Sequence, residues 1–260
     1  MSEELVHYEV ADGIATITLD SPHNRNALSD PLVESLNSAL QQADSAVDVR
    51  VVVLTHSGGT FCAGADLSSA SSLPPGADPV TARGQALADL LRAMLSLGKP
   101  IVGRLDGHVR AGGMGLVGAC DIVVAGPRTT FALTEARLGL APSVISLTVL
   151  PRLTSRDAAD LALTGRVLTA LEGAERGWVT HAVPDSADVD GATRGVLTDL
   201  LKCSPQGLAE TKLLLNRSLL QRFDANREIV VEQSARLFAS EEAREGMAAF
   251  LEKRPPRWAR

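Results

Sequence analysis

The sequence predicts an α/β fold with largely parallel strands and a helical C-terminal region. Over about the first 140 residues, short apolar runs typical of buried strands alternate with segments of helical periodicity. Two of these strands run directly into glycine-rich loops, and from about Ser143 onward the pattern is mainly helical. Together these three observations predict the fold class.

The N-terminal half is expected to hold a hairpin followed by alternating helices and strands. Asp12-Gly13 is a turn signal between predicted strands at 5–10 and 14–19. Ser29 or Asp30 before Pro31 suits a helix N-cap, and the helix would run to about Ala43. The later elements are a buried strand at 50–54, a helix at 80–97, and strands at 101–105 and 121–125.

The C-terminal part is expected to be helical. The candidate helices cover residues 155–163, 171–177, 188–202, 205–220, 223–239 and 241–252. The last three carry apolar residues at helical spacing, and the leucines at 213, 214, 219 and 220 suit packing either on a partner subunit or on the chain's own core. We divide the chain into a core of residues 1–195 and a helical C-terminal region of residues 196–260.

Composition excludes several classes of function. The net charge is −6, with 25 basic and 31 acidic residues and no basic block, which argues against a nucleic-acid binder. No apolar run reaches the roughly 20 residues of a membrane span, and the N-terminus lacks the features of a signal peptide. Three cysteines without CxxC spacing suit a reducing compartment, and the five histidines are scattered. We expect a cytoplasmic protein with no metal site.

The segment Asp106–Asp121, DGHVRAGGMGLVGACD, places glycines at the start of an apolar helix. Glycines there let backbone N–H groups approach a negative group at the positive end of the helix. Gly113-Met-Gly115-Leu-Val-Gly118 also satisfies GxGxxG, with Glu135 about twenty residues on, as in dinucleotide-binding proteins. However, the next strand begins near Asp121, which leaves too short a helix for a Rossmann crossover. Dinucleotide binding is therefore disfavoured.

The second glycine-rich loop, THSGGTFCAGADLSSA, also follows a predicted parallel strand. Both loops can thus meet at the carboxyl edge of the sheet, where one N–H group from each would form an oxyanion hole. An oxyanion hole acidifies the α-carbon of a thioester, and the chemistry then needs one nearby acid or base. Glu135 is the best-placed carboxylate, although it could instead be a surface ion-pair partner of Arg137.

The chain resembles the enoyl-CoA hydratase/isomerase (crotonase) superfamily over nearly its whole length. The segments that carry the resemblance are Pro22-His-Asn-Arg-Asn-Ala-Leu28, Thr60-Phe-Cys-Ala-Gly-Ala-Asp-Leu67, Asp106-Gly107 followed by Ala-Gly-Gly-Met-Gly115, Cys120-Asp121, Phe131 to Pro142, and Gly246-Met-Ala-Ala-Phe-Leu-Glu-Lys253. In this order and spacing they are highly specific. The resemblance implies a ClpP/crotonase-like spiral of ββα units, a helical C-terminal trimerisation region in a trimer or hexamer, and an acyl-CoA thioester substrate with no separate cofactor.

The resemblance also implies site residues. The backbone N–H groups of Ala65 and Gly112 fall on the oxyanion-hole positions, and Glu135 falls on a catalytic position. The expected CoA contacts are Ala63, Asp66 and Leu67 along the adenine and pantetheine, Arg25 and Ala27 in a covering loop, and Phe250 and Lys253 in an element that reaches a neighbouring subunit's CoA.

One departure from the family pattern leaves the reaction open. Typical hydratases carry a first glutamate where this chain has Gly115, so only Glu135 remains of the usual pair. Hydratases of glutaconyl-type thioesters carry a similar Gly-Gly-x-Gly-Leu segment and a later pattern like Thr134 to Pro142 followed by Val-Ile-Ser146, and the closeness of this later segment favours hydration. Enoyl-CoA Δ3–Δ2 isomerases also use a single glutamate at the position of Glu135, and lyase, hydrolase and non-catalytic acyl-CoA-binding alternatives remain. Arg110 would either contact a substrate carboxylate or reach solvent.

Overall fold

The computed structural model describes residues 4–66 and 79–259. Its strands are β1 (Val6–Ala11), β2 (Ile14–Leu19), β3 (Val51–His56), β4 (Thr60–Cys62), β5 (Ile101–Leu105), β6 (His108–Arg110), β7 (Ile122–Ala125), β8 (Thr130–Ala132), β9 (Leu168–Thr169) and β10 (His181–Ala182). Its α-helices are α1 (Asp30–Ser45), α2 (Pro79–Ser96), α3 (Gly112–Ala119), α4 (Ser146–Val149), α5 (Ser155–Thr164), α6 (Ala170–Glu175), α7 (Val189–Lys202), α8 (Pro205–Phe238) and α9 (Glu241–Leu251). Short 3-10 turns include η1 (Pro22–Asn24) and η3 (Glu135–Leu138).

The strands form two sheets. The larger has the order β1-β2-β3-β5-β7-β10, and all of its pairs are parallel except the β1–β2 hairpin. The smaller has the order β4-β6-β8-β9, in which β8 and β9 are antiparallel. Each of β3, β5 and β7 is followed along the chain by a short strand of the second sheet. This repetition is the ββα spiral that the family resemblance implied.

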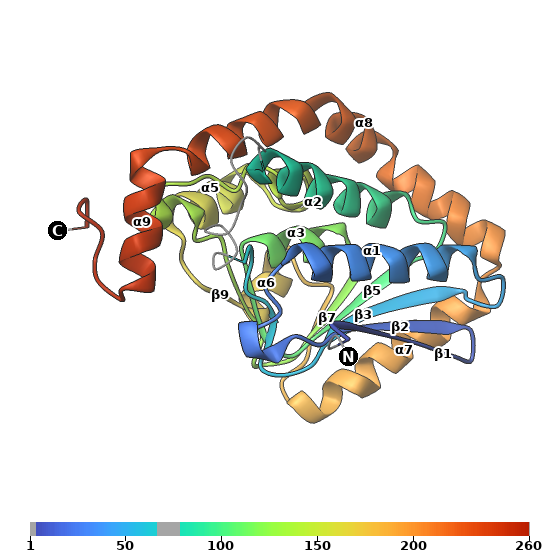
Figure 1. The fold of residues 1–260 in the computed structure, drawn as a ribbon. Coiled ribbons are helices and arrows are strands. Elements are labelled where there is room, and N and C mark those ends of the chain that lie inside the picture. Colours follow the sequence, from blue (N-terminus) through green and yellow to red (C-terminus); the bar gives the residue numbers. More distant parts are fainter. Residues whose placement is uncertain (1–3, 67–78, 260) are drawn as a thin grey trace.

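Helices cover both faces of the larger sheet (Figure 1). On one face lie α1 and α2, with α3 between them and the strands and α8 passing across the outside of α2. On the other face lies α7, whose Val189 packs with Val51, Val102 and Val124 of the central strands. Because the central strands are buried on both faces, they are almost continuously apolar, as in Val51–His56.

Most predicted elements are confirmed within a residue or two, including the helix that Ser29 begins. The Ser29 hydroxyl accepts a hydrogen bond from the Leu32 N–H at 3.4 Å. The helices predicted at 205–220 and 223–239 are instead one continuous helix, α8, because no glycine or proline interrupts residues 208–238. The predicted division at residue 195 falls inside α7, which packs against the sheet.

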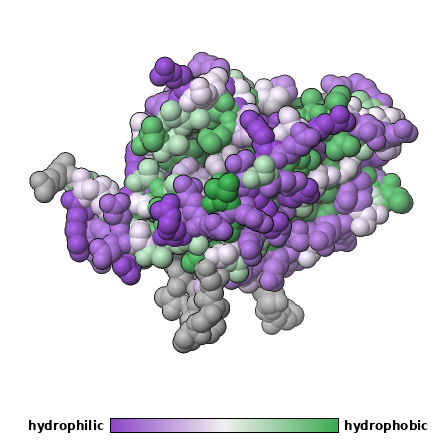
Figure 2. Space-filling model, turned by 90° about the horizontal axis from the view of Figure 1, so that it is seen from above, coloured by the Kyte–Doolittle hydropathy of each residue, from purple (hydrophilic) through white to green (hydrophobic). Residues whose placement is uncertain are grey.

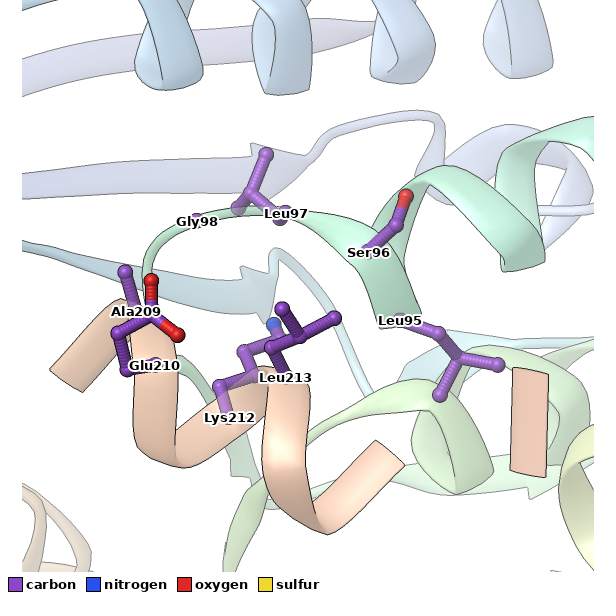
Figure 3. Close-up of a pocket in the computed structure, with 8 residues that line it drawn as sticks. All are labelled: Leu95, Ser96, Leu97, Gly98, Ala209, Glu210, Lys212 and Leu213. Carbon is purple, nitrogen blue, oxygen red and sulfur yellow. The ribbon is translucent and has the colours of Figure 1, made fainter. Parts of the chain in front are cut away.

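A buried lysine fastens α8 to the rest of the molecule. Lys212 is 4% exposed; its Nζ donates to the carbonyl oxygens of Met94 and Lys99 at 2.9 and 3.0 Å and pairs with Asp121 at 2.8 Å. A depression of about 160 Å³ lies beside it, between the end of α2 and α8 (Figure 3). This depression is too small for a CoA thioester.

Exposed hydrophobic side chains remain on the outer face of α8. Leu213, Leu214 and Leu215 are 49%, 65% and 73% exposed, and Ile229 lies further along the same helix, whereas Leu219 is buried. Seen from the α8 side, hydrophobic residues stand among hydrophilic ones on this surface (Figure 2). No helix within residues 4–66 and 79–259 has the length and hydrophobicity needed to cross a membrane.

Candidate active site

A cavity of about 800 Å³ lies between the two glycine-rich loops, α2 and the C-terminal helices. Its walls include the loop from Arg25 to Leu28, the segment after β4, the start of α3, and the stretch from Thr134 to Ile145. The lining is mainly apolar, and α8 and α9 contribute Ser234, Phe238 and Phe250. Its size and composition are those of a site for a small organic ligand.

The two glycine-rich loops touch at one end of this cavity. Gly64 has φ +97°, and a Cβ built on it would lie 2.6 Å from the Ala111 Cβ and 3.4 Å from the Gly112 nitrogen. A third segment joins them, because the Leu28 N–H donates to the Gly64 carbonyl at 2.7 Å. Only a glycine fits this approach, so Gly64 brings the loops together as the sequence predicted.

Two backbone N–H groups at this junction are available to a ligand. Neither the Ala65 nor the Gly112 N–H donates a hydrogen bond within the described part of the chain. Gly112 is the first residue of α3, where an N–H group has no intrahelical acceptor. Ala111 before it has φ 45° and ψ −116°, a conformation that favours glycine and fixes the direction of the Gly112 N–H. The arrangement can hold an oxyanion.

Glu135 lies in the same cavity as these N–H groups. It begins η3 just after β8, and the residue is 9% exposed. Its Oε2 has no hydrogen-bond partner among the described residues. Burial disfavours the charged form and raises the pKa of the carboxyl from 4.5 to about 7. A carboxyl with this pKa can accept and return a proton near neutral pH. The alternative of a surface ion pair with Arg137 is wrong, since that guanidinium donates to the Thr164 carbonyl.

The turn that presents Glu135 is held by α9. Gly139 ends η3 at φ +71°, and a Cβ on it would lie 2.6 Å from the Glu242 backbone carbon. The Leu140 N–H also donates back to the Glu135 carbonyl at 3.0 Å. The C-terminal region thus contributes to positioning the carboxyl in the same chain.

The position of the missing glutamate is closed by apolar side chains. A Cβ built on Gly115 would lie 2.7 Å from the Ile145 Cγ2 and 3.3 Å from the Leu91 Cδ1. Ile145 is 4% exposed and lines the cavity. No carboxylate side chain could be placed at Gly115 without displacing Ile145.

The predicted CoA contacts are only partly gathered at the cavity. Arg25, Ala63 and Asp66 line it, whereas Ala27 is 6% exposed and does not border it, and Leu67 lies outside the described residues. Of the two C-terminal residues, Phe250 borders the cavity of its own chain, and Lys253 is exposed outside it.

Arg110 lines the cavity and does not extend into solvent. Its guanidinium folds back along the second sheet and donates to the Thr130 carbonyl and hydroxyl at 2.7 and 2.8 Å. It is half-buried at the edge of the cavity, and desolvation lowers its pKa. Its role in the described structure is to tie β6 to β8.

Two residues of this region carried little signal in the sequence. Asn26 is fully buried at φ 53°, and its Nδ2 donates to the Thr60 carbonyl at 2.8 Å, which holds the 21–28 loop against β4. Ser143 is 5% exposed and lines the cavity. An Asn in a polar loop and a Ser after a Pro are too common in sequences to be singled out.

Comparison with known proteins gives a consistent result. The family described as enoyl-CoA hydratase/isomerase matches residues 9–260. An enoyl-CoA hydratase of Mycobacterium tuberculosis is 34% identical over 92% of this chain and 91% of its own length, and a 1,2-epoxyphenylacetyl-CoA isomerase of Escherichia coli is 30% identical over 98% of both chains. The crystal structure of an enoyl-CoA hydratase from Mycobacterium avium is 50% identical, with a TM-score of 0.91 over 99% of this chain and 100% of that one.

Proposed function

We propose that this chain, which belongs to the enoyl-CoA hydratase/isomerase family, adds water to the double bond of a 2-enoyl-CoA thioester. The observation that carries the proposal is the Glu135 carboxyl. It is buried, its Oε2 is unpartnered among the described residues, its pKa is about 7, and it shares a cavity with two unused N–H groups. This combination suits the transfer of one proton to and from a polarised thioester.

In the proposed reaction the Ala65 and Gly112 N–H groups hold the thioester oxygen, and the CoA portion lies along Arg25, Ala63 and Asp66. Hydrogen bonding to that oxygen draws electrons from the double bond and makes C3 electrophilic. The Glu135 carboxylate takes a proton from water as the water oxygen bonds to C3, and the electron pair of the double bond moves into an enolate. The Glu135 carboxyl then gives its proton to C2. The enzyme ends in its starting state, and no cofactor takes part.

A second candidate is isomerisation of a 3-enoyl to a 2-enoyl thioester. The apolar closure at Gly115 by Ile145 and Leu91 favours it, because neither of these side chains can hold a water molecule. Glu135 would then remove a proton from C2 and return it to C4, a transfer that needs only one carboxyl. The similarity to a protein named as an acyl-CoA isomerase is compatible with this candidate.

Incubation with 2-enoyl- and 3-enoyl-CoA thioesters, separately, in D₂O and in H₂¹⁸O separates these reactions by mass spectrometry. Hydration predicts a 3-hydroxyacyl product that carries one ¹⁸O after incubation in H₂¹⁸O and one deuterium at C2 after incubation in D₂O. Conversion of the 3-enoyl substrate to the 2-enoyl thioester, with no oxygen incorporated, would show that the enzyme is an isomerase and would refute the proposed hydration. Binding of every thioester without turnover would instead indicate a non-catalytic acyl-CoA-binding subunit.

We also propose a homotrimer or a hexamer. The proposal is supported by the exposed leucines at 213, 214 and 215 on α8, an apolar surface that a subunit contact would cover. Light scattering on the purified chain should give three or six times the 27.3 kDa chain mass. A monomer at micromolar concentration would contradict it.

A further inference from the structure

The active-site cavity contains a second buried polar side chain, Ser143. Of the described residues that line the cavity, only Glu135 and Ser143 are both polar and buried, at 9% and 5% exposure. The other polar residues of the lining are at least partly exposed. A hydroxyl taken out of water without a firm partner is costly, so a buried one facing a ligand cavity calls for an explanation.

The Ser143 hydroxyl makes little use of its hydrogen-bonding capacity inside the chain. Within the described residues it donates only to the Ala141 carbonyl, at a long 3.4 Å, and no group donates to it. By contrast, Arg110 and Arg137 of the lining donate to Thr130 and Thr164 at 3.0 Å or less. The hydroxyl oxygen of Ser143, a residue of the cavity lining, thus has capacity to accept a hydrogen bond, and its one donated bond is weak.

Ser143 and Ile145, the residue that closes the Gly115 position, line the same cavity and lie two residues apart in the chain. Ser143 follows η3 on the turn that begins with Glu135, and Ile145 two residues later contacts the Gly115 position. The turn is rigid, because the Ser146 hydroxyl donates to the Ser143 carbonyl at 2.5 Å and the Ser143 N–H to the Ala141 carbonyl at 2.7 Å. The same short segment therefore supplies the carboxyl, the hydroxyl and the apolar wall.

We propose that the Ser143 hydroxyl is the second water-binding group of this site, in the role that the missing carboxylate cannot fill. This inference rests on the proposed hydration. Ser143 hydrogen-bonds the attacking water and aims its oxygen at C3, while Glu135 takes the proton of that water and passes it to C2. Ser143 gains and loses no proton; the O–H bond of water breaks, and C3–O and C2–H bonds form. Ser143 is a water-positioning catalytic residue, and Ile145 keeps other waters out.

The test compares two reactions in Ser143→Ala and in Ser143→Cys, whose thiol fills the position with a slightly larger and more weakly hydrogen-bonding group. The first is hydration of crotonyl-CoA; the second is exchange of the C2 protons of butyryl-CoA in D₂O, which needs Glu135 and the N–H groups but no added water. We expect both variants to lose at least about tenfold in hydration kcat, the size of one hydrogen bond, with exchange within about threefold of the wild type. Ser45→Ala, an exposed hydroxyl on α1, is the matched control and should change neither rate.

The outcomes separate this inference from the proposed function. A wild-type enzyme that exchanges butyryl-CoA protons but hydrates no 2-enoyl thioester refutes the proposed function, and the water-binding role with it. Wild-type hydration that persists unchanged in both Ser143 variants overturns the water-binding role alone. Equal losses of hydration and exchange also overturn it, because they indicate a general disturbance of the site. If Ser143→Ala does not fold, the two rates of Ser143→Cys alone test the water-binding role.

Discussion

Replacing Glu135 by Gln should make the protein more stable, by an amount that depends on pH. The carboxyl is buried, and its pKa is raised from 4.5 to about 7. Above pH 7 it is charged in both the folded and the unfolded chain, so the folded state bears the desolvation cost of the charge. A shift of this size corresponds to about 3 kcal/mol, which the neutral amide removes.

The gain should disappear in acid. Below about pH 4.5 the carboxyl is neutral in both states, so wild type and variant differ little; the wild type then loses stability as the pH rises toward 7. For a chain of this size, the variant should melt roughly 5 to 10 °C higher at pH 8 and almost together with the wild type at pH 4.5.

Thermal melts by circular dichroism at pH 4.5, 6, 7 and 8 measure this difference directly. The exposed Glu34→Gln serves as the control for removing one negative charge. A Glu135→Gln variant with an unchanged or lower melting temperature at pH 8, or with the same gain at all four values, would refute the assignment of a desolvated carboxyl.

Three further predictions follow from contacts in the structure. The kcat/KM for an enoyl thioester should rise with pH through an apparent pKa near 7, because the carboxylate form of Glu135 accepts the first proton; a flat profile from pH 5 to 9 would count against this. Gly115→Ala should cost about 1–3 kcal/mol in chemical denaturation, since its Cβ would lie 2.7 Å from the Ile145 Cγ2, and adding Ile145→Ala should recover part of the loss; additive effects would show that the contact is unimportant. Lys212→Met should cost about 3–5 kcal/mol by leaving Asp121 unpaired, and a loss below about 1 kcal/mol would contradict the structural role of this ion pair.

Strong local patterns made much of the fold predictable. Strands Ile14–Leu19 and Ile101–Leu105 lie where their apolar runs predict them, and Ser29 caps α1 as its place before Asp30-Pro31 suggests. The second sheet was not predicted. Its strands β4, β6 and β8 have three residues each, too few to show a period, and two of them lie inside segments that read as glycine-rich loops.

The loops and the carboxyl of the site could be predicted from the sequence, whereas the contacts between distant residues that shape it could not. The approach of the two loops follows from glycines after parallel strands, and Gly64 and Gly112 do meet. That Ile145 fills the space beside Gly115 depends on a contact between residues thirty positions apart, which no local pattern reports. The same holds for Arg110, whose hydrogen bonds to Thr130 cross from one strand to the next.

The central claim is that Glu135 alone moves the proton on a thioester held by Ala65 and Gly112. The most direct measurement is the kcat of Glu135→Gln, taken beside its dissociation constant for a non-reactive acyl-CoA. The account predicts a loss of kcat of at least about 100-fold, with the dissociation constant within a few-fold of the wild type. A variant that retains kcat within about threefold of the wild type would contradict it.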